Sequence, residues 1–422
     1  MSAMESMEVL VKAGNHDRKA CPVWVQVPIP AGGVPDIRLT DEDGAAVACQ
    51  AEPSGTGTDD RLWLSWIVRD LPAGGARRYR VTPVHPTQAG EAPEGATDHG
   101  PCVVLEELPD GQLSIAVDGK EFTTYRFGSD VVRPYFFPLI GPTGKSVVRN
   151  WPMVEGVAGE TNDHPHHKGL YVAHGDVNGT DNWSEGPSHC TMRHTGFSRL
   201  VSGPVYGAFD ETVEWLDRDA HTVLSETRRV TVFNLGGDEQ MLDISLRFNS
   251  GSSTVTFGDT KEGGLISIRL ASSLDGPTKR HPENQGQIEN SYGGRQEEET
   301  WGKRAMWCDY YGPLDGETVG VCMMDYPTNP RYPTHWHVRA YGLMTANPFG
   351  LHDFYNDSDT HRGDWTIPAY ESRNFLYRVL LHRGTTAAAG IRERYHDFVN
   401  IPSVELSSPP AAPATTTEEA SA

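Results

Sequence analysis

Two histidine-rich stretches carry most of the residues in this sequence that could do chemistry. The first, residues 160–183, reads ETNDHPHHKGLYVAHGDVNGTDNW, and the second, residues 334–354, reads THWHVRAYGLMTANPFGLHDF. Histidine is the only side chain whose unperturbed pKa lies near neutrality, and it is also the commonest metal ligand. Such clusters indicate proton transfer or metal binding, so we interpret the two stretches as two halves of one active site.

The spacing of the histidines predicts which of them share a face. On an extended strand, side chains two residues apart point to the same side, so His164 pairs with His166, and His335 pairs with His337. If both pairs line one pocket, four imidazoles converge. His164, His166 and His335 are then candidate acid and base residues. The alternative is that the histidines are hydrogen-bonded structural groups.

The same two pairs are also candidate metal ligands. Zinc, manganese and iron bind histidine together with carboxylates, and the candidates here are His164, His166, His335 and His337. Their spacing lacks the ordered pattern of an HExxH or zinc-finger site. The cofactor prediction therefore stays open, with a divalent metal as the alternative to a metal-free site.

A carboxylate partner for the histidines is predicted in the segment FGDTKEGGLISIRL, residues 257–270. Glu262 precedes Gly263 and Gly264, and glycines permit close approach of the backbone to a pocket. Two groups of unequal pKa can divide the donor and acceptor roles of acid/base catalysis, so Glu262 is the fourth candidate catalytic residue. A charged hairpin turn is the alternative interpretation.

The side chains around the histidines are of the kinds that bind sugars. Aromatic rings stack on the apolar faces of a sugar, while planar and charged donors hydrogen-bond its hydroxyl groups. The candidate substrate-binding residues are His167, Lys168, His174, Trp183, Lys261, Trp336, His337, Arg339, Tyr341 and Asn347. Each alone fits core packing or an ordinary surface position, but together they favour a small sugar or glycoside as the ligand.

The composition of the chain limits the classes of partner and the cellular compartment that we expect for this protein. The 422 residues carry a formal net charge of -21, so long-range electrostatics repels nucleic acid and anionic membranes. No stretch approaches the eighteen or so apolar residues of a membrane-spanning helix, and the N-terminus lacks the features of a signal peptide. We therefore expect a cytoplasmic protein without nucleic-acid or membrane partners, and the sequence leaves its oligomeric state open.

The pattern of short alternating runs predicts an all-β fold. The predicted organisation is a small β-sandwich over residues 1–84, a linker over 85–100, a large antiparallel β-sandwich over 101–404 and a disordered tail over 405–422. One helix is expected near the C-terminus, over residues 387–400. The long polar insertion at residues 272–300 is expected to be a loop that covers the site or a disordered segment.

Four segments carry a resemblance to a known family. YFFPLIGPTG, NDHPHHKGLYVAHGDVNG, FGDTKEGGLISIRLA and THWHVRAYGLMTANPFG resemble signature segments of an uncharacterised bacterial all-β family labelled "methane oxygenase". The resemblance covers roughly residues 101–400 and implies an association with sugar-oxidising proteins, hence oxidised glycosides as substrates. The chain resembles more weakly the sugar-binding supersandwich of galactose mutarotase. That likeness implies a histidine acid and a glutamate base, here His164, His166 or His335 with Glu262.

The leading functional prediction is a carbohydrate-active lyase or hydrolase that acts on a glycoside. In a keto-glycoside, the carbonyl acidifies the neighbouring C–H bond, so a positioned imidazole can take that proton while an acid protonates the leaving oxygen. Two alternatives stay open. One is a metal-dependent oxygenase or hydrolase with histidine ligands, and the other is a non-catalytic sugar-binding module.

Overall fold

The computed structural model divides the chain into two compact units. The first consists of residues 1–98 and 401–422, and the second of residues 99–400. The structure describes residues 6–28, 36–53, 61–84 and 102–407. The predicted linker, residues 85–100, and the tail beyond residue 407 lie outside the described residues.

The first unit packs two antiparallel sheets around a core of buried valine, leucine and tryptophan side chains. One sheet has the order β26 (Ser403–Ser407), β1 (Met7–Lys12), β7 (Ala76–Val84), β3 (Asp36–Asp41) and β4 (Ala46–Val47). The other has the order β2 (Arg18–Pro28), β6 (Arg61–Leu71) and β5 (Cys49–Pro53). Because β26 pairs with β1, residues 403–407 complete this unit, where the sequence had predicted the end of the large domain and the start of the tail.

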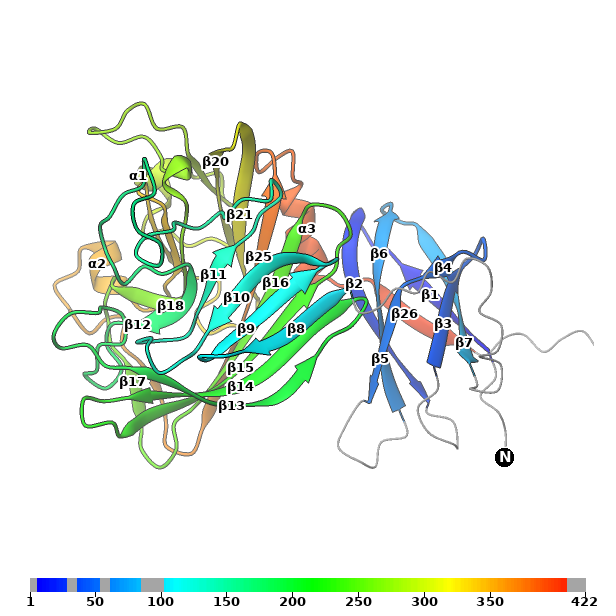
Figure 1. Ribbon diagram of the computed structural model, residues 1–422, viewed down its shortest axis with the longest axis horizontal. Coiled ribbons are helices and arrows are strands. Elements are labelled where there is room, and N and C mark those ends of the chain that lie inside the picture. Colours follow the sequence, from blue (N-terminus) through cyan, green and yellow to red (C-terminus); the bar gives the residue numbers. More distant parts are fainter. Residues whose placement is uncertain (1–5, 29–35, 54–60, 85–101, 408–422) are drawn as a thin grey trace, which may run out of the picture. The chain divides into compact units, whose positions relative to one another are not determined.

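The second unit contains two eight-stranded antiparallel sheets, which we call the front and back sheets (Figure 1). The front sheet has the order β22 (Trp336–Arg339), β23 (Leu343–Ala346), β18 (Gly263–Arg269), β12 (Leu170–His174), β11 (Tyr135–Leu139), β10 (Lys120–Arg126), β9 (Gln112–Val117) and β8 (Val103–Leu108). The back sheet has the order β13 (Met192–Val201), β14 (Tyr206–Leu216), β15 (Thr222–Phe233), β16 (Gln240–Asn249), β25 (Ser372–Arg383), β21 (Glu317–Asp325), β20 (Trp307–Leu314) and β19 (Gln287–Asn290). The strands β17 (Val255–Phe257) and β24 (Trp365–Ile367) pair as a separate two-stranded antiparallel sheet.

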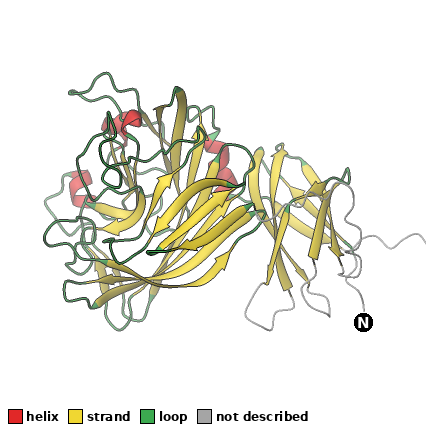
Figure 2. Cartoon of the chain, in the orientation of Figure 1, coloured by secondary structure: helices red, strands yellow, loops and turns green. Residues whose placement is uncertain are grey.

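The two sheets share one hydrophobic core. Leu170 and Ile268 of the front sheet lie in the same buried cluster as Ile244 and Val379 of the back sheet. Strands dominate the unit (Figure 2), which confirms the predicted all-β fold class. Within the described residues, no helix is long and apolar enough to cross a membrane.

Three short α-helices complete the second unit: α1 (Gln296–Thr300), α2 (Leu351–Tyr355) and α3 (Ile391–Val399). The predicted C-terminal helix is α3, but it begins later than residue 387. Gly390 precedes it with a φ of 64°, a left-handed conformation that ends the preceding turn and delays the helix. The polar insertion at residues 272–300, expected to be a site-covering loop or a disordered segment, is a loop that carries the 3-10 turn η2 (Ser272–Leu274), β19 and α1.

Candidate functional site

The strand β22 shows how the front sheet positions the second histidine stretch. Trp336 and Val338 belong to the hydrophobic core, so His337 and Arg339 point to the opposite face of the sheet. His335 lies two residues before His337, so it points to the same face. It is also buried, with 6% of its surface exposed. The face away from the core is therefore the polar face, and it carries His335 and His337.

Cross-strand pairing extends this polar face into a row of hydroxyl groups. Thr345 lies opposite His337, Ser267 lies opposite Thr345, and Tyr171 lies opposite Ser267. The hydroxyl oxygens of Thr345, Ser267 and Tyr171 are buried and have no hydrogen-bond partner among the described residues. An unpartnered buried hydroxyl costs roughly 1–3 kcal/mol, so three in a row on one face point to a region with a role beyond folding.

Asp163 and His164 form a pair at the exposed edge of this face. Asp163 Oδ2 lies 3.0 Å from His164 Nδ1, and about two-fifths of each side chain is exposed. On its other oxygen, Asp163 accepts from Arg149 at 2.5 Å and from Arg269 at 2.8 Å. Both arginine side chains are fully buried. They hold the aspartate from the protein interior, while the imidazole of His164 is partly exposed to solvent.

The charges around Asp163 keep it ionised. Burial alone would raise the pKa of its carboxyl group, but hydrogen bonds from His164 and Arg149 and the charge of Arg269 outweigh burial and hold that pKa well below its usual range. His164 itself adopts a φ of 47°, a left-handed conformation that is uncommon for residues other than glycine. Asp163 is therefore charged, and the backbone of its partner His164 is locally constrained.

Tyr341 joins the two histidine stretches. Its ring stacks on His164 with a centroid distance of 5.2 Å and an interplanar angle of 8°, and His164 also stacks on His167 at 4.8 Å. The guanidinium carbons of Arg269 and Arg339 lie 4.7 Å and 5.7 Å from the centroid of Tyr341. Burial raises the pKa of Tyr341 to about 12, so its phenol keeps its proton at neutral pH.

His166 and His167 lie behind His164 and are held neutral. Burial, reinforced by the nearby arginines, lowers the pKa of His166 to about 4 and that of His167 well below its usual value. Arg269 Nη1 lies 3.3 Å from His167 Nδ1, and both rings meet Trp183 edge to face. Trp183 is 2% exposed, so it supports the histidines rather than facing solvent.

Lys168 and the buried Arg133 form a separate ionic support. Glu185 accepts from Lys168 at 2.7 Å and from Arg133 at 3.3 Å. Arg133 also donates to the carbonyl oxygen of His166 at 3.0 Å. This network fixes the backbone of the first histidine stretch at His166.

The second pair of histidines packs among aromatic rings instead. Trp301 Nε1 donates to His337 Nδ1 at 3.1 Å, and burial, with the charges of Arg339 and Lys261, lowers the pKa of His337 to about 3. The Nε2 of His335 lies 2.9 Å from the hydroxyl of Tyr355. Burial likewise lowers the pKa of His335 to about 4. Both rings are therefore neutral, and the contacts described above join this stretch to the first one through Tyr341.

Glu262 and Lys261 lie at the start of β18 and are partly exposed. Their charged groups are 3.3 Å apart, and 52% of Glu262 is exposed. The carboxylate of Glu262 is close enough to Tyr341 to raise its pKa, a smaller effect than burial. Gly263 has a φ of 122°, and a Cβ there would lie 2.9 Å from the backbone of His174, so this glycine permits close approach to the paired strand β12; the predicted approach to a pocket stays a prediction.

Three predicted binding residues are enclosed by protein. His174 is fully buried, with Nε2 2.9 Å from the carbonyl oxygen of Gly258. Trp336 lies in the core and donates to the carbonyl oxygen of Ala305. Asn347 is also fully buried and donates to the carbonyl oxygen of Thr260 at 3.0 Å. In this structure all three side chains support the site's framework and none reaches its exposed face.

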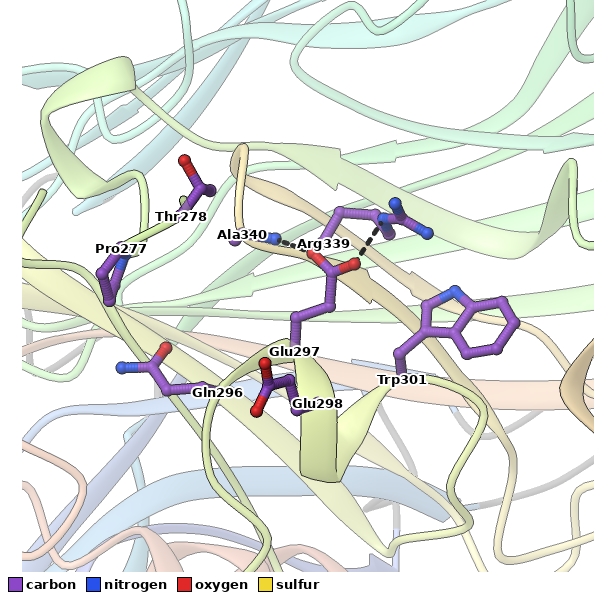
Figure 3. A pocket seen from close by; sticks show the side chains of 8 residues that line it. All are labelled: Pro277, Thr278, Gln296, Glu297, Glu298, Trp301, Arg339 and Ala340. Carbon is purple, nitrogen blue, oxygen red and sulfur yellow. Dashed lines mark hydrogen bonds and ion pairs between the residues drawn. The ribbon is translucent and has the colours of Figure 1, made fainter. Parts of the chain in front are cut away.

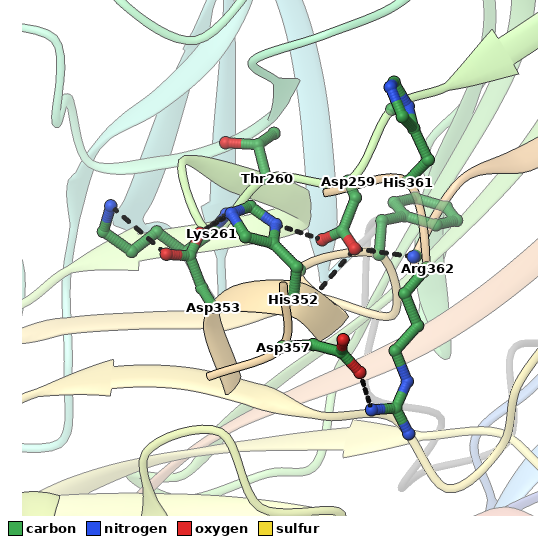
Figure 4. Close-up of polar contacts among 12 residues, drawn as sticks. Asp259, Thr260, Lys261, His352, Asp353, Asp357, His361 and Arg362 are labelled. Atoms are coloured by element: carbon green, nitrogen blue, oxygen red, sulfur yellow. Dashed lines mark hydrogen bonds and ion pairs between the residues drawn. The ribbon is translucent and has the colours of Figure 1, made fainter. Parts of the chain in front are cut away.

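A second aspartate–histidine pair was not predicted from the sequence. Asp259 Oδ1 and His352 Nδ1 lie 3.0 Å apart, although the two groups are not aligned for a hydrogen bond (Figure 4). The other oxygen of Asp259 accepts from the backbone N–H groups of His352 at 2.9 Å and Gly363 at 2.6 Å. Asp353 follows on α2, with Oδ2 3.6 Å from His352 Nε2. The sequence signal was only an aspartate and a histidine 93 residues apart, which no spacing rule connects.

The buried arginines were missed as well, although one of them left a signal. Arg269 ends a strand whose other residues are apolar or small, GGLISIR, and every residue of that strand is buried. A charged residue in a fully buried run must be paired. Arg149 lies in a loop and gave no comparable signal.

The four candidate metal ligands are not gathered into a compact ligand set. In the described part of the chain, the only three ligand atoms of His, Cys, Asp or Glu residues that lie within 4.8 Å of one another belong to Asp217, Asp219 and His221. That exposed turn is remote in sequence from both histidine stretches. His164 and His166 instead contact each other edge to face at 5.7 Å.

Comparisons with solved structures give distant likenesses. A glycosyl hydrolase family 38 protein and an alpha-mannosidase, both from Enterococcus faecalis, are each 10% identical over 96% of this chain, with TM-scores of 0.42 and 0.43. The matches cover 47% and 46% of those chains, so this chain spans just under half their length. A GalM/aldose epimerase homologue from C. elegans is 8% identical over 68% of this chain and 100% of its own, with a TM-score of 0.26. At these values the likenesses carry no argument about activity.

Sequence comparison places the second unit in a family. Among curated proteins, no sequence matches the chain. A family profile matches residues 112–396, a range that includes both histidine stretches, Glu262 and the arginines beneath Asp163. The chain therefore belongs to the family of unknown function DUF6807.

Proposed function

We propose that this protein is a carbohydrate-active enzyme that cleaves a glycoside by proton transfer, with a keto-glycoside as the preferred substrate class. The observation that carries the proposal is the Asp163–His164 pair. Its carboxylate is fixed by two buried arginines, and its imidazole is exposed beside Tyr341. A carboxylate on Nδ1 fixes the orientation of the ring and leaves Nε2 as the atom that exchanges a proton.

The reaction that fits these groups is an elimination. His164 Nε2 takes the proton from the carbon next to the substrate carbonyl, and the electron pair of that C–H bond forms a new C=C bond. The bond from the sugar to the glycosidic oxygen breaks, and this oxygen takes the phenol proton of Tyr341. The imidazolium of His164 then returns its proton to the phenolate through solvent. No oxidant or reductant is consumed.

Arg339 and Glu262 support this reaction electrostatically. Arg339 lies over Tyr341 and is one-third exposed, so its charge is available to the enolate oxygen that develops after proton removal. Glu262 contributes to keeping the Tyr341 phenol protonated.

The test is a screen of methyl and aryl glycosides and their keto derivatives for aglycone release, followed by mass spectrometry. We expect release from a keto-glycoside, unchanged in excess EDTA, and reduced about 100-fold or more in Tyr341→Phe. Tyr370→Phe is the matched control, because that tyrosine is 84% exposed and lies outside the site. Loss of activity in EDTA that is restored by a divalent metal would instead favour the metal-dependent alternative.

A further inference from the structure

A cleft of about 550 Å³ lies beside the proposed site, between α1 and β22 (Figure 3). Its walls include Gln296, Glu298 and Trp301 on one side and Arg339 on the other. Small-molecule sites commonly have volumes of roughly 300–1,000 Å³. The cleft uses the polar insertion at residues 272–300 as one wall, and the reaction proposed above leaves it unused.

Trp301 connects this cleft to the proposed site. Its half-buried ring lines the cleft, while its Nε1 donates to His337. The guanidinium carbon of Arg339 lies 6.0 Å from the ring centroid of Trp301 and 5.7 Å from that of Tyr341. One guanidinium group therefore lies next to both the cleft and the proposed site. A molecule that reacts beside Tyr341 and extends past Arg339 enters the cleft.

The polar groups of the cleft fit an uncharged ligand with hydroxyl groups. Gln296 Oε1 is buried without a hydrogen-bond partner among the described residues, and Gln296 adopts a φ of 54°. Glu297 is already engaged, by Arg339 at 3.1 Å and by the N–H of Ala340 at 2.7 Å. Glu298 is exposed and adds a further negative charge. Acceptors that outnumber cations disfavour phosphates and carboxylates and favour hydroxyl donors.

We propose that the cleft binds a second sugar ring, so that the substrate is a disaccharide-sized glycoside. This inference rests on the proposed function. The indole of Trp301 offers an apolar face to the ring, while Gln296 Oε1 and the carboxylate of Glu298 accept hydrogen bonds from its hydroxyl groups. Arg339 then lies between the reacting ring and the second ring.

The experiment is calorimetric titration of the full chain with cellobiose, lactose and maltose, each compared with the methyl glycosides of its two component sugars. We expect at least one disaccharide to bind about tenfold more tightly than its methyl glycosides, a difference of about 1.4 kcal/mol. Gln296→Ala and Glu298→Ala should each remove most of that preference. Glu299→Ala is the matched control, because Glu299 is exposed on the same helix and does not line the cleft.

The outcomes separate this inference from the proposed function. A preference for a disaccharide that persists in Gln296→Ala and Glu298→Ala, or no such preference at all, overturns the second-ring site. If methyl keto-glycosides are nevertheless turned over, the proposed function stands without it. A preference that both variants remove, in a protein that releases no aglycone from any keto-glycoside, supports the cleft and overturns the proposed reaction.

Discussion

Two of the aspartate–histidine pairs in the second unit, Asp163–His164 and Asp259–His352, have the same 3.0 Å separation and different surroundings. In the Asp163–His164 pair, two buried arginines hold the carboxylate, and 41% of the histidine is exposed. In the Asp259–His352 pair, backbone N–H groups hold a carboxylate with no exposed surface, and 24% of the histidine is exposed.

The difference indicates separate tasks for the two pairs. Backbone donors tie Asp259 to the first turn of α2 and to Gly363, so that pair closes a loop. Arginine side chains hold Asp163 without enclosing it, so His164 stays accessible and next to Tyr341. The same two residue types therefore hold a loop in one place, and in the other they orient an exposed imidazole, which we propose as the proton acceptor.

The largest expected effect is a difference in catalytic activity between variants of His164 and of His352. His164→Ala should lower aglycone release from a keto-glycoside by about 10²- to 10⁴-fold, because a general base contributes that much. His352→Ala should change it by less than about tenfold. Rates measured on both variants at equal folded concentration check this, and equal losses in the two would remove the distinction between the pairs.

Removal of the Asp163 carboxylate should lower the free energy of unfolding more than removal of the Asp259 carboxylate. Asp163→Ala leaves Arg149 and Arg269 buried near each other without their shared counter-charge, so we expect a loss of about 3 kcal/mol in the free energy of unfolding. Asp259→Ala leaves two backbone N–H groups unsatisfied and should cost about 2 kcal/mol. Urea unfolding of both variants measures these losses. A change below about 0.5 kcal/mol for Asp163→Ala would mean that the arginines do not depend on it.

A smaller effect should appear in the pH dependence of stability. His337 has a lowered pKa, about 3 in the folded protein, so it stays neutral there while the unfolded chain binds a proton below about pH 6.5. Its contribution to stability is therefore complete above pH 6.5 and declines as the pH falls toward 4. His337→Gln should reduce the difference in unfolding free energy between pH 7.5 and 4.5 by about 2 kcal/mol.

Asp163→Asn is the control for that measurement. The carboxyl pKa of Asp163 is lowered in the fold, so its stabilising effect is lost only below the unfolded value of about 3.9. This variant should leave the dependence between pH 7.5 and 4.5 as it is in the wild type. If His337→Gln leaves the pH dependence of the unfolding free energy unaltered, the imidazole of His337 is accessible to water in solution.

The sequence predicts the framework of this protein better than its site. Alternating runs such as QLSIAV identify strands because one face is buried, and β9 shows that alternation residue by residue. The two histidine stretches were also identified, because seven of the chain's 17 histidines fall within them. Tyr341 was singled out as a binding residue, but its stacking on His164 depends on how two loops 177 residues apart in sequence meet.

The supporting residues could not be predicted, for a physical reason. Arg149, Arg269 and Asp163 form one ionic group across three segments, and only the three-dimensional pairing of strands brings them together. In the same way, the sequence could not show which side chains surround His335 and His337, whose sharing of one pocket with the first pair stays a prediction. His335 packs on Phe354, and His337 accepts a hydrogen bond from Trp301. No short-range sequence pattern predicts that these residues lie close together.

Hydrogen–deuterium exchange of a substrate proton tests the central claim most directly. A methyl keto-glucoside is incubated with the protein in D₂O, and NMR follows the C–H signal next to the carbonyl. We predict that the wild type and His352→Ala exchange or eliminate this proton at similar rates, that Asp163→Asn is slower, and that His164→Ala is reduced to the uncatalysed rate. Undiminished exchange in His164→Ala would contradict the assignment of His164 as the base.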